Sequence, residues 1–129
     1  VGPIGALIIG VITAGFCLWG VNGIKRLLKA DDSLDVFGIH GIGGIVGGLL
    51  TGIFNAKPLG GPGLESLAEI PGQLWFQLEG MLIAAALSGL VTVIGLKIAG
   101  ALSGGLRVER DAEREGLDIT THGERAYHQ

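Results

Sequence analysis

The sequence contains little sulfur, few aromatic residues and little charge. Cys17 is its one cysteine, so neither a disulfide nor a cluster of thiolate metal ligands can form within one chain. Aromatic residues make up 5% and are not interleaved with basic patches, which argues against nucleic acid as a partner. Charged residues make up only 16%, whereas hydrophobic residues reach 48% and the mean hydropathy is +0.56. A soluble domain of 129 residues rarely needs so much apolar surface, so the composition predicts lipid around most of the chain.

Charge is unevenly distributed along the chain. Residues 1–24 contain no charged side chain, whereas residues 104–129 contain ten. This separation predicts a lipid-embedded part followed by a tail in water. The chain starts at Val1 and has neither a basic leader segment nor a cleavage-site pattern. We therefore interpret it as part of a longer protein and not as a signal peptide.

Three apolar runs are long enough to cross a bilayer. The first, Ile4 to Ile24, would form a helix about 31 Å long and match a hydrocarbon core of roughly 30 Å. The second is rich in glycine, and the third follows Pro71 and carries Glu79 and Lys97 towards its ends, where long side chains reach the headgroups. The sequence thus predicts an all-α fold, a polytopic membrane helix bundle fragment with three transmembrane helices. The predicted helices cover 1–28, 36–56 and 72–103, the loops 29–35 and 57–71, and the tail 104–129.

The basic residues beside the spans predict the orientation, because cytoplasmic loops collect Lys and Arg. The first connection and the region after the third span are basic, whereas the second connection holds only Lys57. We therefore expect loop 29–35 and the tail on the cytoplasmic side and loop 57–71 outside. The basic residues are Lys25, Arg26 and Lys29 at the first connection and Lys97, Arg107, Arg110 and Arg114 at the tail.

Acidic and hydroxyl side chains precede the second span. Asp32, Ser33 and Asp35 can accept hydrogen bonds from free backbone N–H groups and oppose the positive end of the helix dipole. Ser33 and Asp35 also lie near His40, but no acyl-transfer motif surrounds them. We interpret these residues as helix caps and expect no enzymatic activity.

Glycines recur through the second span at a spacing of four residues, which lets helix backbones approach closely in a membrane. We expect these glycines to be packing surfaces, a role that identifies no function. A dinucleotide-binding loop is excluded, because Val46 occupies its last glycine position and no Gly-Lys-Ser/Thr follows. The packing glycines are Gly43, Gly44, Gly47 and Gly48.

His40 is the exceptional residue of the second span, because an ionisable group in lipid is costly unless it faces protein or a polar pathway. A neutral imidazole offers one donor and one acceptor to a small polar permeant. Three roles stay open from the residues alone: a structural hydrogen bond, the lining of a pathway, or a metal or haem ligand. A haem would need a second well-placed histidine, so we expect no metal and no cofactor. At about 100° per residue, His40 shares its face with Ser33, Val36, Gly44, Gly47 and Thr51.

Two parts of the sequence resemble a known family. Residues 31–44, Asp-Asp-Ser-Leu-Asp-Val-Phe-Gly-Ile-His-Gly-Ile-Gly-Gly, resemble the late transmembrane signature of the Amt/Mep/Rh ammonium transporter family. In the tail, residues 105–108, 115–118 and 122–127 resemble the cytoplasmic end of the Amt branch. The resemblance covers essentially the whole chain and implies the last three of eleven helices with the C-terminal tail.

The resemblance implies a function for the parent protein. Such transporters conduct ammonium or ammonia through a hydrophobic pore lined by a pair of histidines, and the match assigns pore-lining roles to His40 and Val36. The second histidine, the recruitment site and the gate would lie in earlier helices, so the fragment alone is not expected to transport. A homotrimer in the cell membrane with a cytoplasmic C-terminus is also implied. The alternative is a membrane assembly or anchor module whose tail recruits a soluble partner.

The tail alternates in charge and then continues with apolar residues separated by glycines. A solvated, disordered tail is one interpretation. We favour ordered docking on the cytoplasmic face, because glycines permit turns between short docking pieces. The resemblance implies a regulatory tail and a PII-type nitrogen-signalling protein as partner, and phosphorylation of a tail threonine would add about −1.5 to −2 charges. The regulatory candidates are Gly116, Asp118, Thr120 and Tyr127.

Overall fold

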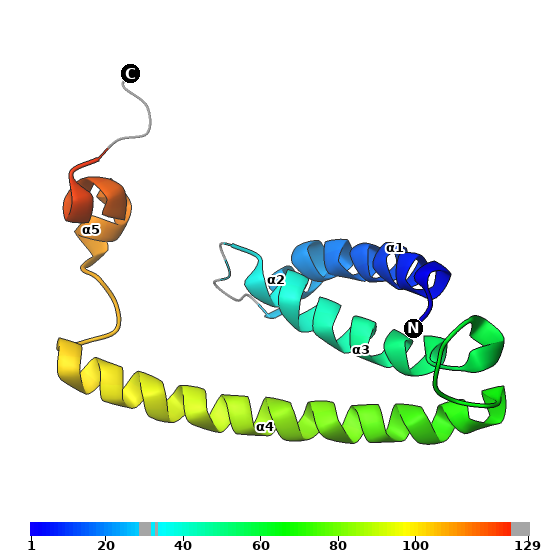
Figure 1. The fold of residues 1–129 in the computed structure, drawn as a ribbon. Helices are drawn as coiled ribbons and strands as arrows, with labels where there is room; N and C mark the ends of the chain where they lie inside the picture. Colours follow the sequence, from blue (N-terminus) through cyan, green and yellow to red (C-terminus); the bar gives the residue numbers. More distant parts are fainter. Residues whose placement is uncertain (29–31, 33, 125–129) are drawn as a thin grey trace. The chain divides into compact units, whose positions relative to one another are not determined.

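A computed structural model describes residues 1–28, 32 and 34–124, and the described residues form helices and loops without a strand (Figure 1). Three helical stretches are long and apolar enough to cross a membrane: Pro3–Gly23, Phe37–Phe54 and Leu67–Ser103. The chain divides into two units, residues 1–85 and 86–129, which are described separately. The prediction of an all-α fold with three membrane-spanning helices is confirmed.

The first unit begins with one nearly continuous helical stretch. Helix α1 covers Pro3–Trp19, the π-helical turn η1 covers Gly20–Ile24, and α2 covers Lys25–Leu28. Pro3 occupies the first turn of α1, where its missing N–H costs no intrahelical hydrogen bond. The uncharged sequence and this start signal explain why the helix runs almost to the first connection.

The second helical stretch opens with a π-helical turn and lies alongside α1 (Figure 1). The turn η2 covers Phe37–Gly41, and α3 covers Ile42–Phe54. At the other end of this pair, a Cβ on Gly5 would lie 3.2 Å from Cδ1 of Phe54, so the ring packs directly on the α1 backbone. The absence of a side chain at Gly5 therefore allows the two helices to approach.

The loop after α3 folds back on the end of that helix. It contains the 3₁₀ turns η3, Lys57–Leu59, and η4, Leu67–Glu69. The Lys57 N–H donates to the Leu64 carbonyl at 2.8 Å, and the Lys57 ammonium forms an ion pair with Glu65. A Cβ on Gly61 would lie 2.3 Å from the Asn55 carbonyl carbon, so only glycine fits that approach. The loop is thus built from specific backbone contacts.

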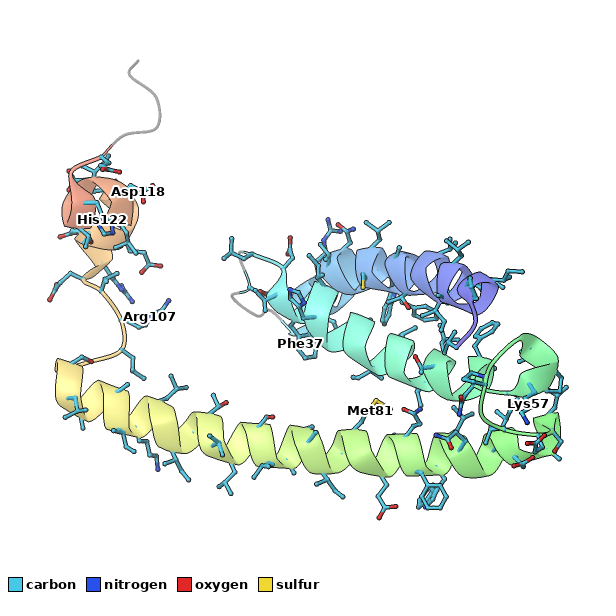
Figure 2. All side chains as sticks on the ribbon, in the orientation of Figure 1. Phe37, Lys57, Met81, Arg107, Asp118 and His122 are labelled. Carbon is cyan, nitrogen blue, oxygen red and sulfur yellow. The ribbon has the colours of Figure 1, made fainter. Side chains whose placement is uncertain are left out.

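Helix α4 covers Ile70–Ser103 and runs through both units. It begins two residues before the predicted start at residue 72, because Pro71 lies inside its first turn instead of preceding it. The Ser66 N–H donates to the Glu69 carboxylate at 2.9 Å just before the helix. Within the first unit, Met81 points from α4 towards α3 (Figure 2).

The second unit continues from α4 into short helical pieces of the tail. Helix α5 covers Arg110–Glu115, and the π-helical turn η5 covers Asp118–His122. Gly116 has φ +102° and Gly123 has φ +67°, values that favour glycine. Both the N–H and the hydroxyl of Thr120 donate to the Gly116 carbonyl at 3.1 Å. The tail therefore folds locally around Gly116, whereas Tyr127 lies outside the described residues.

Candidate functional site

His40 lies within the π-helical turn η2 and is exposed to the surroundings of this chain. Val36, one residue before that turn, is also exposed. A π-helical turn inside a longer helix is rare and is found frequently at functional sites, because it changes the direction in which side chains project. The histidine singled out by sequence is therefore on an irregular turn and not on a regular helix.

The backbone N–H groups at the start of η2 are satisfied by Asp32. Its two carboxylate oxygens accept hydrogen bonds from the N–H groups of Val36 at 2.8 Å and Phe37 at 2.9 Å. These are N–H groups that have no partner within a helix, and a carboxylate there also opposes the helix dipole. Asp35 adopts φ +55°, unusual for a residue with a side chain, and Ser33 lies outside the described residues.

The glycines of α3 face two different neighbours. A Cβ on Gly43 would lie 3.1 Å from the Cys17 sulfur, and one on Gly47 would lie 3.9 Å from the Thr13 hydroxyl, both on α1. A Cβ on Gly48 would instead lie 3.2 Å from the Met81 sulfur on α4. Gly43 and Gly48 therefore lie at close helix–helix contacts, and Gly47 lies at an ordinary van der Waals contact.

Gly44 is different, because a Cβ built on it meets no atom within 4 Å and the residue is exposed. Among the described residues, Gly44 does not have the predicted packing role. One residue of α-helix turns the chain by about 100°, which carries Gly44 away from the α1 contact made by Gly43. The spacing of four residues identified the glycines but did not distinguish the helix face of each.

The uncovered face of this helix carries His40. On a helical wheel, Gly44 and Thr51 lie between the direction of α1, marked by Gly43, and that of α4, marked by Gly48. His40, Gly44 and Thr51 are all exposed. The Thr51 hydroxyl donates to the Gly47 carbonyl at 2.8 Å. Its proton is therefore already hydrogen-bonded within the helix and needs no partner outside it. The result is a narrow, mostly small-residue strip with one imidazole.

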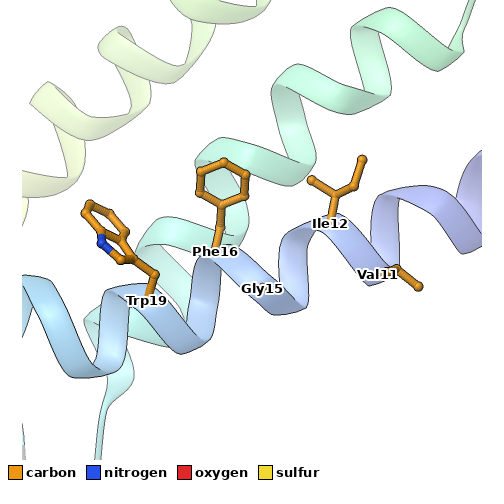
Figure 3. A pocket seen from close by; sticks show the side chains of 5 residues that line it. All are labelled: Val11, Ile12, Gly15, Phe16 and Trp19. Atoms are coloured by element: carbon orange, nitrogen blue, oxygen red, sulfur yellow. The ribbon is translucent and has the colours of Figure 1, made fainter.

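Nothing in the described residues suggests a metal centre, since they contain no group of three or more His, Cys, Asp or Glu side chains able to hold an ion. An apolar hollow lies along α1, lined by Val11, Ile12, Gly15, Phe16 and Trp19 (Figure 3). Its lining offers no acid or base. We therefore take His40 and its face, not this hollow, as the candidate site.

Two structural features were missed by the sequence reasoning. The Cys17 thiol donates to the Ile39 carbonyl at 3.4 Å, and the turns η1 and η2 contact each other. The sequence excludes a disulfide at Cys17 but does not predict this hydrogen bond. No sequence pattern predicts a π-helical turn, because such a turn is defined by hydrogen bonds between residues five apart and not by its amino-acid composition.

The fold defines an α-helical membrane protein, with a histidine on the exposed face of a glycine-rich span. Residues 1–127 match the Ammonium Transporter Family. The chain belongs to this family.

Named relatives agree with that assignment. The chain is 38% identical over 126 residues to the ammonium transporter of Bacillus subtilis (strain 168), covering 97% of this chain and 31% of that protein. It is 42% identical over 125 residues to the ammonium transporter of Aquifex aeolicus (strain VF5), covering 96% and 29%. It is 37% identical over 131 residues to ammonium transporter MEP2 of Saccharomyces cerevisiae (strain ATCC 204508 / S288c), covering 95% and 26%. The chain thus spans less than a third of each relative, and no solved structure matches it significantly.

Proposed function

We propose that this chain is part of an ammonium transporter, and that His40 and Val36 line the pathway through which ammonium or ammonia crosses the membrane. The observation that carries the proposal is the exposure of His40 on a strip of small residues within a membrane-spanning helix. Family membership over residues 1–127 supports ammonium as the substrate.

The chemistry of the strip suits a small polar permeant. A neutral imidazole can accept a hydrogen bond from ammonia through one nitrogen and donate through the other. Gly44 beside it offers no side chain, so the passage would be narrow but open. The second histidine of the proposed pair and the remaining walls would come from helices outside this sequence. One histidine-bearing helix with two neighbours cannot enclose a pore, so the chain alone would not transport.

The parent protein would be a homotrimer in the cell membrane with a cytoplasmic C-terminus. The basic residues of the first connection and of the tail support that orientation. An alternative is an assembly or anchor module whose tail recruits a soluble partner, which the packing of Gly43 and Gly47 against α1 favours. Both roles use the same helix but different faces of it.

Reconstitution into liposomes tests the proposal. An inward ammonium gradient should drive flux through the complete parent protein, while an equal potassium gradient should not. The 129-residue chain alone should give no flux above empty liposomes. Absence of ammonium flux from a correctly assembled parent, or flux from this chain alone, would contradict the proposal.

We further propose that the tail is a regulatory latch, with Gly116, Asp118, Thr120 and Tyr127 as its candidate residues and a PII-type protein as its partner. The local fold supports an ordered tail, because the Gly116 carbonyl accepts both hydrogen bonds from Thr120. Phosphorylation of Thr120 would remove its hydroxyl as a donor and add negative charge.

Gly116→Asp should release this latch, because φ +102° is strained for any residue with a side chain. In the complete parent we expect faster hydrogen exchange across residues 105–124 and an altered flux, with trimer yield unchanged. Glu115→Asp, which keeps the charge of the adjacent helical residue, is the control. Rapid exchange already in the unmodified parent, with flux insensitive to Gly116→Asp, would show a merely solvated tail.

A further inference from the structure

The two π-helical turns of the first unit contact each other at a pair of glycines, Gly20 and Gly38. A Cβ on Gly38 of η2 would lie 2.8 Å from the nitrogen of Val21 and 2.9 Å from its Cα. A Cβ on Gly20 of η1 would lie 3.1 Å from the Gly38 carbonyl oxygen. Gly38 is buried in this contact. The backbone two residues before His40 therefore rests directly on the backbone of the first span.

A second contact fixes the same turn from α1. The Cys17 thiol donates to the carbonyl of Ile39, the residue immediately before His40, at 3.4 Å. That carbonyl also accepts a hydrogen bond from the N–H of Ile42, the first residue of α3. The thiol thus holds a backbone group in the middle of the π-helical turn, at a carbonyl that also bonds to the start of the regular helix α3.

The register of this turn determines where His40 projects. A π-helical turn holds more residues than an α-helical turn, so relaxation to α-helix would rotate His40 relative to the residues that follow it. The imidazole would then project in a different direction relative to Gly44 and Thr51. Contacts that hold the π-helical turn therefore also hold the direction of the imidazole.

We propose that Cys17 and Gly38 are positioning residues for His40: they keep η2 in its π-helical register and so fix the direction of the imidazole relative to Gly44. Only the expected effect of these residues on transport rests on the proposed function. The direction of the imidazole is a structural quantity that can be measured separately.

The test uses the complete parent protein with Cys17→Ala, Cys17→Ser and Thr13→Ala. Thr13 is a matched control, because it lies on the same helix four residues before Cys17 and packs on Gly43 and Gly47 of α3. Two quantities are measured: the ¹⁵N resonances of the His40 imidazole, assigned by their loss in His40→Ala, and the ratio of ammonium to methylammonium flux. Thermal unfolding checks that each variant is folded.

Cys17→Ala should shift the His40 resonances and change the flux ratio by up to about tenfold, the limit set by the loss of one hydrogen bond. Cys17→Ser should return both quantities towards the parent values, since its hydroxyl can donate to Ile39, and Thr13→Ala should leave both unchanged. Unshifted resonances in Cys17→Ala, or equal shifts in Cys17→Ala and Thr13→Ala, would overturn the inference. Shifted resonances with an unchanged flux ratio would sustain the positioning of His40 and count against its proposed role in the pathway.

Discussion

Replacing His40 with alanine in the complete parent should lower ammonium flux on the order of 10- to 100-fold, without loss of trimer or of thermal stability. The imidazole is exposed in this chain, so its removal leaves no packing defect among the described helices. A permeant in an apolar pore would instead lose its hydrogen-bond partner, which costs about 1–3 kcal/mol. Every 1.4 kcal/mol corresponds to about a tenfold change, which gives the expected size.

The control for this substitution is Ile45→Ala, a truncation on the same helix at an exposed apolar position outside the His40 strip. It should change flux little. Unchanged flux in His40→Ala together with loss of the trimer would instead support the assembly module. Unchanged flux with an intact trimer would remove His40 from the pathway altogether.

The helices themselves were predictable because lipid requires long apolar runs, and such runs are visible in the sequence without any knowledge of packing. The predicted second span, 36–56, compares with a helical stretch over Phe37–Phe54. The capping position of Asp32 also follows from local chemistry, since its carboxylate lies one turn before the N–H groups of Val36 and Phe37.

The details of the site were less predictable because they depend on contacts between distant residues. Gly43 and Gly44 are identical and adjacent, yet one faces Cys17 and the other faces open space. Without the position of α1, the spacing in the sequence cannot tell which of the two glycines packs against that helix. The π-helical turn at His40 could not be predicted for the same reason. It is associated with the contact between Gly38 and Val21, and the sequence does not reveal that contact.

This difference between adjacent glycines leads to a paired prediction. Gly43→Leu should lower the yield and melting temperature of the assembled parent, because a Cβ there already lies 3.1 Å from the Cys17 sulfur. Overpacking of this kind typically costs about 1–3 kcal/mol, and a leucine adds three further carbons beyond the Cβ. Flux per assembled trimer should be affected less than the yield. Size-exclusion chromatography and thermal unfolding measure the assembly.

Gly44→Leu should produce the opposite pattern, with near-normal assembly and blocked flux. Its Cβ meets no atom of the described residues within 4 Å, so α1 and α4 need not move. The leucine side chain would instead project along the strip beside His40, where the pathway is proposed to run. Normal flux in an assembled Gly44→Leu trimer would place the pathway elsewhere. Equal loss of assembly in both variants would mean that the Gly44 face is a helix contact in the complete parent, and that the strip is closed by packing instead of open to the permeant.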